Sequence, residues 1–108
     1  MPDPVPEITV AELASRLPEA LLVDVRQPAE YVEAHVPTAR LVPLQELPDR
    51  VGELPAGEPV FVICRSGARS LVASEFLVAQ GFEAVNVAGG TLAWIEAGKD
   101  VVVGDQPA

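Results

Sequence analysis

The sequence has only one cysteine, one histidine, one tryptophan and one lysine among its 108 residues. A single cysteine cannot close an internal disulfide, so no disulfide framework is expected to hold the fold. One histidine and one cysteine cannot form a structural zinc site without several carboxylates, so we expect no metal.

Positive charge is also scarce, because seven Lys and Arg residues stand against sixteen Asp and Glu residues, for a net charge of −9. Nucleic acid and anionic membranes would be repelled, and neither is expected as a partner. The first ten residues, MPDPVPEITV, lack the basic and long apolar regions of a secretory signal. No apolar run approaches the ~18 residues that span a bilayer. These absences predict a cytoplasmic location.

The length predicts one domain, and the 49% of hydrophobic residues suits a globular core. Prolines at positions 2, 4 and 6 predict a flexible N-terminus over residues 1–6. The last five residues, GDQPA (104–108), predict a flexible tail. The domain is therefore expected to cover residues 7–103.

Short apolar runs alternate with helical patterns along the chain. Strands are predicted at 7–9, 20–25, 41–44, 59–64, 84–88 and 101–103, and helices at 10–17, 28–35, 44–54 (interrupted by Pro48), 68–80 and 89–98. Thr9 and Glu12 have the spacing of a capping box. Strands that are apolar throughout are typically covered on both faces. The pattern predicts an α/β fold, a small three-layer α/β/α domain with a central, mostly parallel sheet of about five strands.

The segment VFVICRSGARS (60–70) places two of the seven cations within five positions of the only thiol. Binding sites of open α/β sheets lie beyond the carboxyl ends of the strands, where Cys64 falls. Gly67 permits a tight turn that directs N–H groups inward, and such a nest favours anions. With Arg65, Arg69 and a helix N-terminus nearby, the thiol pKa is expected to fall from ~8.5 to ~3.5–7.5.

A lone cysteine at a strand end is commonly just a small buried hydrophobe. The flanking arginines and Gly67 favour instead a reactive thiol in an anion site. The residues alone leave the substrate open between a phosphate, a sulfonate, a persulfide and an oxidant.

Three segments together resemble the rhodanese-like sulfurtransferases, in a single-domain form. They are DVRQPAEYVEAHVPTARLVPLQEL (24–47), CRSGARS (64–70) and GFEAVNVAGGTLAWIEAG (81–98). They lie in the family's order and cover most of the chain. Ala34 and Thr38 stand where the family usually has glycine, which puts the local turn geometry in question.

The resemblance implies a sulfurtransferase that moves sulfane sulfur from thiosulfate or a persulfide to a thiophilic acceptor through a Cys64 persulfide. The acceptor would be cyanide in an assay and a thiol in the cell, and no metal or organic cofactor is implied. The implied partners are a small anionic sulfur donor and a thiol or protein sulfur acceptor, and the chain would be a monomer or a weak homodimer. Cys64 would be catalytic, and the implied substrate-binding residues are Arg65, Ser66, Gly67, Ala68, Arg69 and Ser70.

Two other functions remain open on the same fold. One is a non-catalytic or sulfur-carrier interaction module, and the other, less favoured, is a phosphatase or an arsenate-type reductase. Sulfurtransferase relatives have a six-residue loop, which Cys64–Arg69 matches, whereas the phosphatases have an arginine six positions after the cysteine. That position holds Ser70 here.

We expect mainly structural roles for several other polar and aromatic residues. Asp24 and Arg26 follow a strand, and Arg26 is expected to pair with Glu30 four residues on, with a role at the pocket rim as the alternative. His35 is expected to be a hydrogen-bonded structural histidine rather than the partner of Cys64. Tyr31 and Trp94 are expected in the core or the pocket wall.

Overall fold

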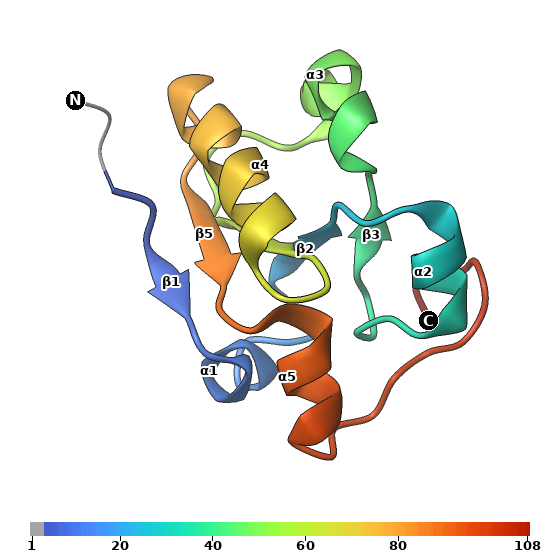
Figure 1. Ribbon diagram of the computed structural model, residues 1–108. Coiled ribbons are helices and arrows are strands. Elements are labelled where there is room, and N and C mark those ends of the chain that lie inside the picture. The colour runs from blue at the N-terminus through green and yellow to red at the C-terminus, as the bar shows by residue number, and fades with distance from the viewer. Residues whose placement is uncertain (1–3) are drawn as a thin grey trace.

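The computed structural model describes residues 4–108, so the predicted flexible N-terminus lies partly outside the described residues. The strands are β1 (Glu7–Ile8), β2 (Leu21–Asp24), β3 (Arg40–Leu41), β4 (Val60–Ile63) and β5 (Ala84–Val87). The helices are α1 (Val10–Ala14), α2 (Pro28–Glu33), α3 (Leu47–Arg50), α4 (Ala68–Ala79) and α5 (Gly90–Glu96), with short 3-10 turns η1 (Leu44–Glu46) and η2 (Val51–Glu53) (Figure 1). Within residues 4–108, no helix is long and apolar enough to cross a membrane.

The five strands form one sheet in the order β1-β5-β4-β2-β3, and every pairing is parallel. The predicted α/β fold with a parallel sheet is therefore confirmed. In the register of β2 and β4, Asp24 lies beside Ile63, so both strands end at the same edge of the sheet. The segments that begin with Val25 and Cys64 therefore both start at this edge of the sheet.

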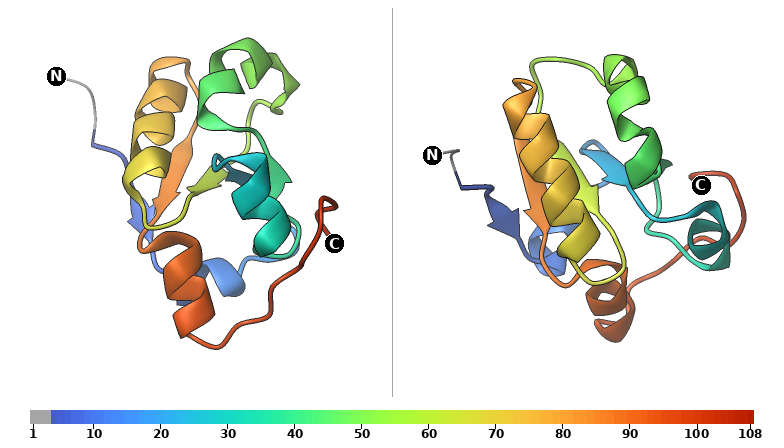
Figure 2. Two further views of the ribbon diagram at one scale, coloured as in Figure 1. Left: turned by 45° about the vertical axis from the view of Figure 1, so that its right-hand side comes forward. Right: turned by 45° about the horizontal axis from the view of Figure 1, so that its top comes forward.

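Alternating side chains of the central strands fill two separate cores. On one face, Val60 and Val62 join a cluster that includes Leu47 of α3 and Leu77 of α4. On the other face, Phe61 packs in a cluster with buried residues of the three remaining helices, which are Leu13 of α1, Tyr31 of α2 and Trp94 of α5. The helices thus cover both faces of the sheet, as the views in Figure 2 show. The expected core positions of Tyr31 and Trp94 are confirmed.

Several element boundaries differ from the predicted ones. The capping box forms as expected, since the Thr9 hydroxyl accepts from the Glu12 N–H and the Glu12 carboxylate accepts from the Thr9 N–H, but α1 ends already at Ala14. β3 ends at Leu41, although the Val42 and Leu44 N–H groups still donate to the Asp24 and Val25 carbonyls at 2.9 and 3.0 Å. The interrupted helix at 44–54 is confirmed as η1, α3 and η2.

The predicted strand at 101–103 is wrong, because only Val102 pairs, in an isolated antiparallel bridge with His35. The segment after it also differs from the predicted flexible tail. The Gly104 N–H donates to the Val32 carbonyl at 2.8 Å, and the Thr38 N–H donates to the Pro107 carbonyl at 3.0 Å. The C-terminal residues are thus hydrogen-bonded to α2 and to the segment that follows it.

His35 links this C-terminal segment to α2. Its buried ring stacks on Tyr31 with 3.6 Å between ring centroids. Nδ1 lies 2.8 Å from the Tyr31 carbonyl oxygen, and Nε2 lies 2.9 Å from the Gln106 carbonyl oxygen. The expectation of a hydrogen-bonded structural histidine is confirmed.

Replacing His35 with alanine is expected to lower the free energy of unfolding by about 2 kcal/mol or more. Both ring nitrogens face carbonyl oxygens, and an imidazole with a single N–H donates to only one of them, which contributes about 1 kcal/mol; the cavity left by the ring adds the rest of the cost. Denaturant unfolding monitored by circular dichroism measures the effect. Gln106→Ala is the control, because the contact uses the main-chain carbonyl of Gln106, and its effect should stay within about 0.5 kcal/mol. Equal stabilities of the two variants would contradict the assigned role.

Candidate active site

Cys64 lies directly beyond the end of β4, and a short loop carries the chain from it into α4. Its side chain is 1% exposed and belongs to the core cluster on the α4 face of the sheet. Gly67, which precedes α4, has a φ of 112°. This left-handed conformation is open to glycine and strained for other residues, so the tight turn depends on Gly67.

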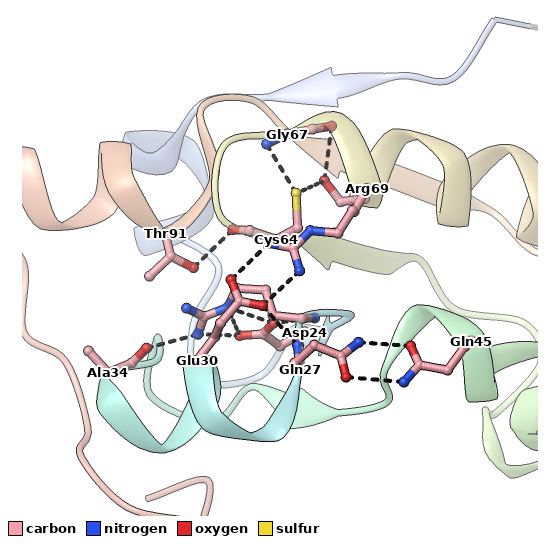
Figure 3. Close-up of polar contacts among 11 residues, drawn as sticks. Asp24, Gln27, Glu30, Ala34, Gln45, Cys64, Gly67, Arg69 and Thr91 are labelled. Atoms are coloured by element: carbon pink, nitrogen blue, oxygen red, sulfur yellow. Dashed lines mark hydrogen bonds and ion pairs between the residues drawn. The ribbon is translucent and has the colours of Figure 1, made fainter.

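Two donors of the loop converge on the thiol. The Gly67 N–H lies 3.1 Å from Cys64 Sγ, and the Ser70 hydroxyl lies 3.3 Å from it on the first turn of α4 (Figure 3). The Ser70 side chain is fully buried. The sulfur atom therefore sits inside the curve of the loop, with N–H and O–H groups directed at it.

Burial raises the pKa of the Cys64 thiol, but hydrogen bonds outweigh this effect and leave the pKa below its ordinary value. The donors are the Ser70 hydroxyl first, and then the backbone N–H groups of Ser70, Gly67 and Ser66. These are neutral groups. The leading causes of the lowered pKa of Cys64 are thus dipoles, while the charge of Arg69 interacts with Cys64 as a minor contribution, seen in the raised pKa of Arg69.

The start of α5 supports the outer side of the same loop. The Thr91 N–H and hydroxyl donate to the Cys64 carbonyl at 2.9 and 3.0 Å, and the Leu92 N–H donates to the Arg65 carbonyl at 3.0 Å. These carbonyl groups therefore point toward α5 and away from the sulfur.

Gly90 makes this close approach possible. A Cβ at Gly90 would lie 2.5 Å from the Cys64 carbonyl oxygen and 2.6 Å from that of Arg65. Gly89 is similarly restricted, since its φ is 78° and a Cβ there would lie 2.6 Å from the Ala93 side chain. The sequence analysis placed both glycines in a matching segment without a role. A glycine pair at the start of a helix is the signal that could have pointed to this contact.

Arg69 makes a bidentate ion pair with Glu30 of α2. Its two terminal nitrogens lie 2.7 and 2.8 Å from the two carboxylate oxygens (Figure 3). The hydrogen bonds from Arg69 lower the pKa of Glu30 to about 2, and those to Glu30 raise the pKa of Arg69. The sequence analysis named Glu30 only as a partner of Arg26, and no signal in the sequence pointed to its pairing with Arg69, which lies 39 residues further along.

The predicted pairing of Arg26 with Glu30 is wrong, because Arg26 turns back to Asp24. Its Nη2 and Nε lie 2.8 and 3.0 Å from carboxylate oxygens of Asp24, and Nη2 also donates to the Ala34 carbonyl at 2.8 Å. Both side chains are buried, which agrees with the structural role expected for the pair. Asp24 is the last residue of β2, and only Val25 separates it from Arg26, so the two side chains lie close together.

Arg65 is exposed, and within residues 4–108 it makes no ion pair. It borders a surface cavity of about 410 Å³ between α2 and α5. The cavity is lined by charged residues of the loop and of the α2 region and by less polar residues of α5, which are Arg26, Glu30, Glu33, Ala34, Arg65, Thr91, Leu92 and Ile95. The cysteine loop therefore has an open, mixed polar and apolar surface beside it.

Comparison with known proteins identifies the family of this chain. The family model described as the rhodanese-like domain matches residues 9–97. The chain belongs to the rhodanese-like family.

Individual relatives agree with this assignment. A protein of Allochromatium vinosum named sulfurtransferase is 40% identical over 100 residues, which are 89% of this chain and 94% of that one. The thiosulfate sulfurtransferase GlpE of Vibrio cholerae is 34% identical over 89 residues, or 82% of this chain and 84% of that one. The crystal structure of a rhodanese-related protein from Thermoplasma volcanium superposes with a TM-score of 0.87 at 34% identity, covering 91% and 98% of the two chains. The chain is thus similar to single-domain sulfurtransferases.

The family comparison clarifies the two positions where glycine is replaced. Ala34 has a φ of −171°, an extended conformation that any residue adopts. Thr38 has a φ of 75°, the left-handed conformation that favours glycine, and it is the one non-glycine residue with positive φ among those described. Of these two positions, Thr38 alone carries backbone strain.

The residues of the predicted loop lie around Cys64 Sγ, but they differ in how they contact it. Gly67 and Ser70 contact Cys64 Sγ, and Ser66 acts on the thiol through its N–H. Ala68 begins α4, while Arg69 is paired with Glu30 and Arg65 is exposed. Their binding of a substrate stays a prediction.

Replacing Ser70 with alanine is expected to raise the pKa of Cys64. The substitution removes a hydrogen-bond donor that stabilises the thiolate. The protonated thiol is then favoured over a wider pH range, and the midpoint of reactivity moves to higher pH. Rates of alkylation by iodoacetamide as a function of pH measure the midpoint. Ser66→Ala should leave it in place, because Ser66 contributes through its backbone. An unchanged midpoint in Ser70→Ala would refute this account.

Replacing Gly90 with alanine is expected to cost about 1–3 kcal/mol of stability and to displace the cysteine loop, because the new Cβ overlaps two carbonyl groups at a φ of 60°. Denaturant unfolding and Cys64 alkylation report the two effects. Gly52→Ala is the matched control, since nothing lies within 4 Å of a Cβ there. Identical behaviour of the two variants would show that the close approach of α5 is dispensable.

Proposed function

We propose that the chain is a sulfurtransferase that carries sulfane sulfur from thiosulfate or a persulfide to a thiophilic acceptor, as a persulfide of Cys64. The observation that carries the proposal is the convergence of the Gly67 N–H and the Ser70 hydroxyl on Cys64 Sγ. A lowered pKa increases the share of the thiol present as thiolate, its nucleophilic form, at any given pH. The relatives named sulfurtransferase support the same reaction class.

The first half-reaction transfers one sulfur atom to the enzyme. The Cys64 thiolate attacks the outer sulfur of thiosulfate, the sulfur–sulfur bond of the donor breaks, and sulfite leaves with the electron pair. A persulfide donor reacts in the same way and releases a thiolate. The donors that now face Cys64 Sγ, together with neighbouring N–H groups of the loop, would then bind the added sulfur.

The second half-reaction removes the sulfur. An acceptor thiolate attacks the outer sulfur of the Cys64 persulfide, and the Cys64 thiolate leaves with the electron pair, ready for another cycle. This is covalent, ping-pong catalysis that uses one nucleophile and no further redox partner. The exposed Arg65 beside the cavity provides a positive charge for an anionic donor. A reducing cytoplasm suits a resting thiolate, and this location stays a prediction.

Loop length is the reason for preferring sulfur to phosphorus. Arg69 is the fifth residue after Cys64, and Ser70 occupies the sixth position, where phosphatases of this fold have their arginine. Moreover, both terminal nitrogens of the Arg69 guanidinium are already bound by the Glu30 carboxylate. A phosphate dianion would therefore lack the bidentate arginine that its binding calls for.

Treatment with thiosulfate or an organic persulfide, without reducing agent, is expected to add the mass of one sulfur atom to the protein, measured on the intact chain by mass spectrometry. Cys64→Ser should stay unmodified, because the only thiol is lost. Addition of cyanide or a thiol should then return the wild type to its original mass.

Two outcomes would contradict this function. Failure of both donors to modify the wild type would exclude a sulfurtransferase, and Cys64-dependent hydrolysis of an aryl phosphate would favour a phosphatase. A persulfide that no acceptor unloads would instead indicate a sulfur-carrier module without turnover.

A further inference from the structure

Of the two arginines in the cysteine loop, only one has a positive charge that is not already neutralised. The Glu30 carboxylate binds both terminal nitrogens of Arg69, at 2.7 and 2.8 Å. Among residues 4–108, Arg65 makes no ion pair and is exposed. The loop therefore offers an anion less positive charge than its sequence indicates.

The pairing of Glu30 with Arg69 persists throughout the pH range in which a thiolate exists. The hydrogen bonds from Arg69 hold the pKa of Glu30 at about 2, so the carboxylate stays charged. Glu30 is also positioned by its own helix, because its Oε1 accepts from the Gln27 N–H at 3.1 Å. An incoming anion would have to compete with a carboxylate that α2 already holds in place.

The other charges near the loop add no unpaired cation among the described residues, and Glu33, which borders the same cavity without an ion pair, is negative. Asp24 and Arg26 neutralise each other in a buried ion pair. The reacting groups would thus be a thiolate and, for thiosulfate, a donor with two negative charges, with one unpaired cation between them. Like charges that approach in a partly dehydrated site repel strongly. An organic persulfide brings at most one negative charge to the reacting sulfur, so it meets less repulsion.

The surface beside the loop also suits an organic donor. The cavity of about 410 Å³ bordered by Arg65 is lined on its α5 side by Leu92 and Ile95, whose side chains are 37% and 45% exposed. Apolar groups at a site of this kind stabilise the carbon skeleton of a ligand, and thiosulfate has none.

We infer that Glu30 is a specificity-determining residue, which neutralises Arg69 and thereby directs the site to low-molecular-weight organic persulfides in preference to thiosulfate. This inference rests on the proposed sulfurtransferase function. The step is R–S–SH plus the Cys64 thiolate giving the Cys64 persulfide and R–S⁻. The donor sulfur–sulfur bond breaks, the thiolate R–S⁻ leaves with the electron pair, and the proton stays on the transferred sulfur.

The test compares kcat/KM of the wild type and Glu30→Gln for two donors, thiosulfate and glutathione persulfide. Glutamine keeps the size of the side chain and an oxygen for the Gln27 N–H, but it removes the charge that neutralises Arg69. The wild type should prefer the persulfide. Glu30→Gln should raise kcat/KM for thiosulfate by about tenfold and change that for the persulfide by less than about threefold. The gain should shrink as salt is added, because it is electrostatic.

Glu75→Gln is the matched control. Glu75 lies on α4, is exposed, does not line the cavity and forms no ion pair among the described residues. Its substitution changes the net charge by the same amount without releasing Arg69, so the donor preference should shift by less than about threefold. Glu30→Asp, which keeps the charge, should retain the preference of the wild type. Thermal unfolding of each variant identifies loss of folding.

The outcomes separate this inference from the proposed function. A wild type that gains sulfur from neither donor refutes the proposed function and the inference together. A wild type that reacts, combined with an unchanged donor ratio in Glu30→Gln, refutes the inference alone. An equal fall with both donors also refutes it, because Glu30 would then merely position Arg69 for both substrates.

Discussion

The contact between the start of α5 and the cysteine loop is the constraint on which the candidate site depends. Thr91 and Leu92 give their N–H groups to the carbonyls of Cys64 and Arg65, where a helix N-terminus has unpaired donors to offer. A peptide whose carbonyl points outward can present its N–H inward. By holding the Arg65 carbonyl on the other side, α5 orients the peptide whose Ser66 N–H acts on Cys64 Sγ, and Gly90 lets the helix come close enough.

Neutral donors, rather than cations, dominate the chemistry of the thiol. The groups that lower the pKa of Cys64 are a hydroxyl and backbone N–H groups, and they act against the desolvation of a buried side chain. Fixed dipoles in such an environment are effective because they need no reorganisation when charge appears on the sulfur. The nearby charges form ion pairs instead, one between Arg26 and Asp24 and one between Arg69 and Glu30. In the proposed function, activation of the thiol and recognition of a donor would thus be carried by different groups.

Much of the fold was predictable because it follows from local patterns. The strands that are apolar throughout, the capping box at Thr9 and the interrupted helix after residue 44 appear close to the predicted positions. The same patterns placed Cys64 at the carboxyl edge of the sheet, where the structure has it.

The predictions failed where other contacts overrode a local preference. The i,i+4 spacing of Arg26 and Glu30 favoured a helical ion pair, but each side chain found a partner outside that pattern. The C-terminal residues look loose in sequence, yet they are hydrogen-bonded to α2 and to the segment that follows it, in part through His35.

The sequence by itself determined an α/β sheet with one thiol at its edge, because apolar strand runs and a glycine before a helix impose these features locally. It also determined the loop length, since Arg69 falls five residues after Cys64. Only the tertiary structure decided which groups reach the sulfur and which charges remain unpaired. Those contacts join residues as distant as Glu30 and Arg69, or Cys64 and Thr91, and their geometry arises when parallel strands bring the ends of separate segments to one edge of the sheet.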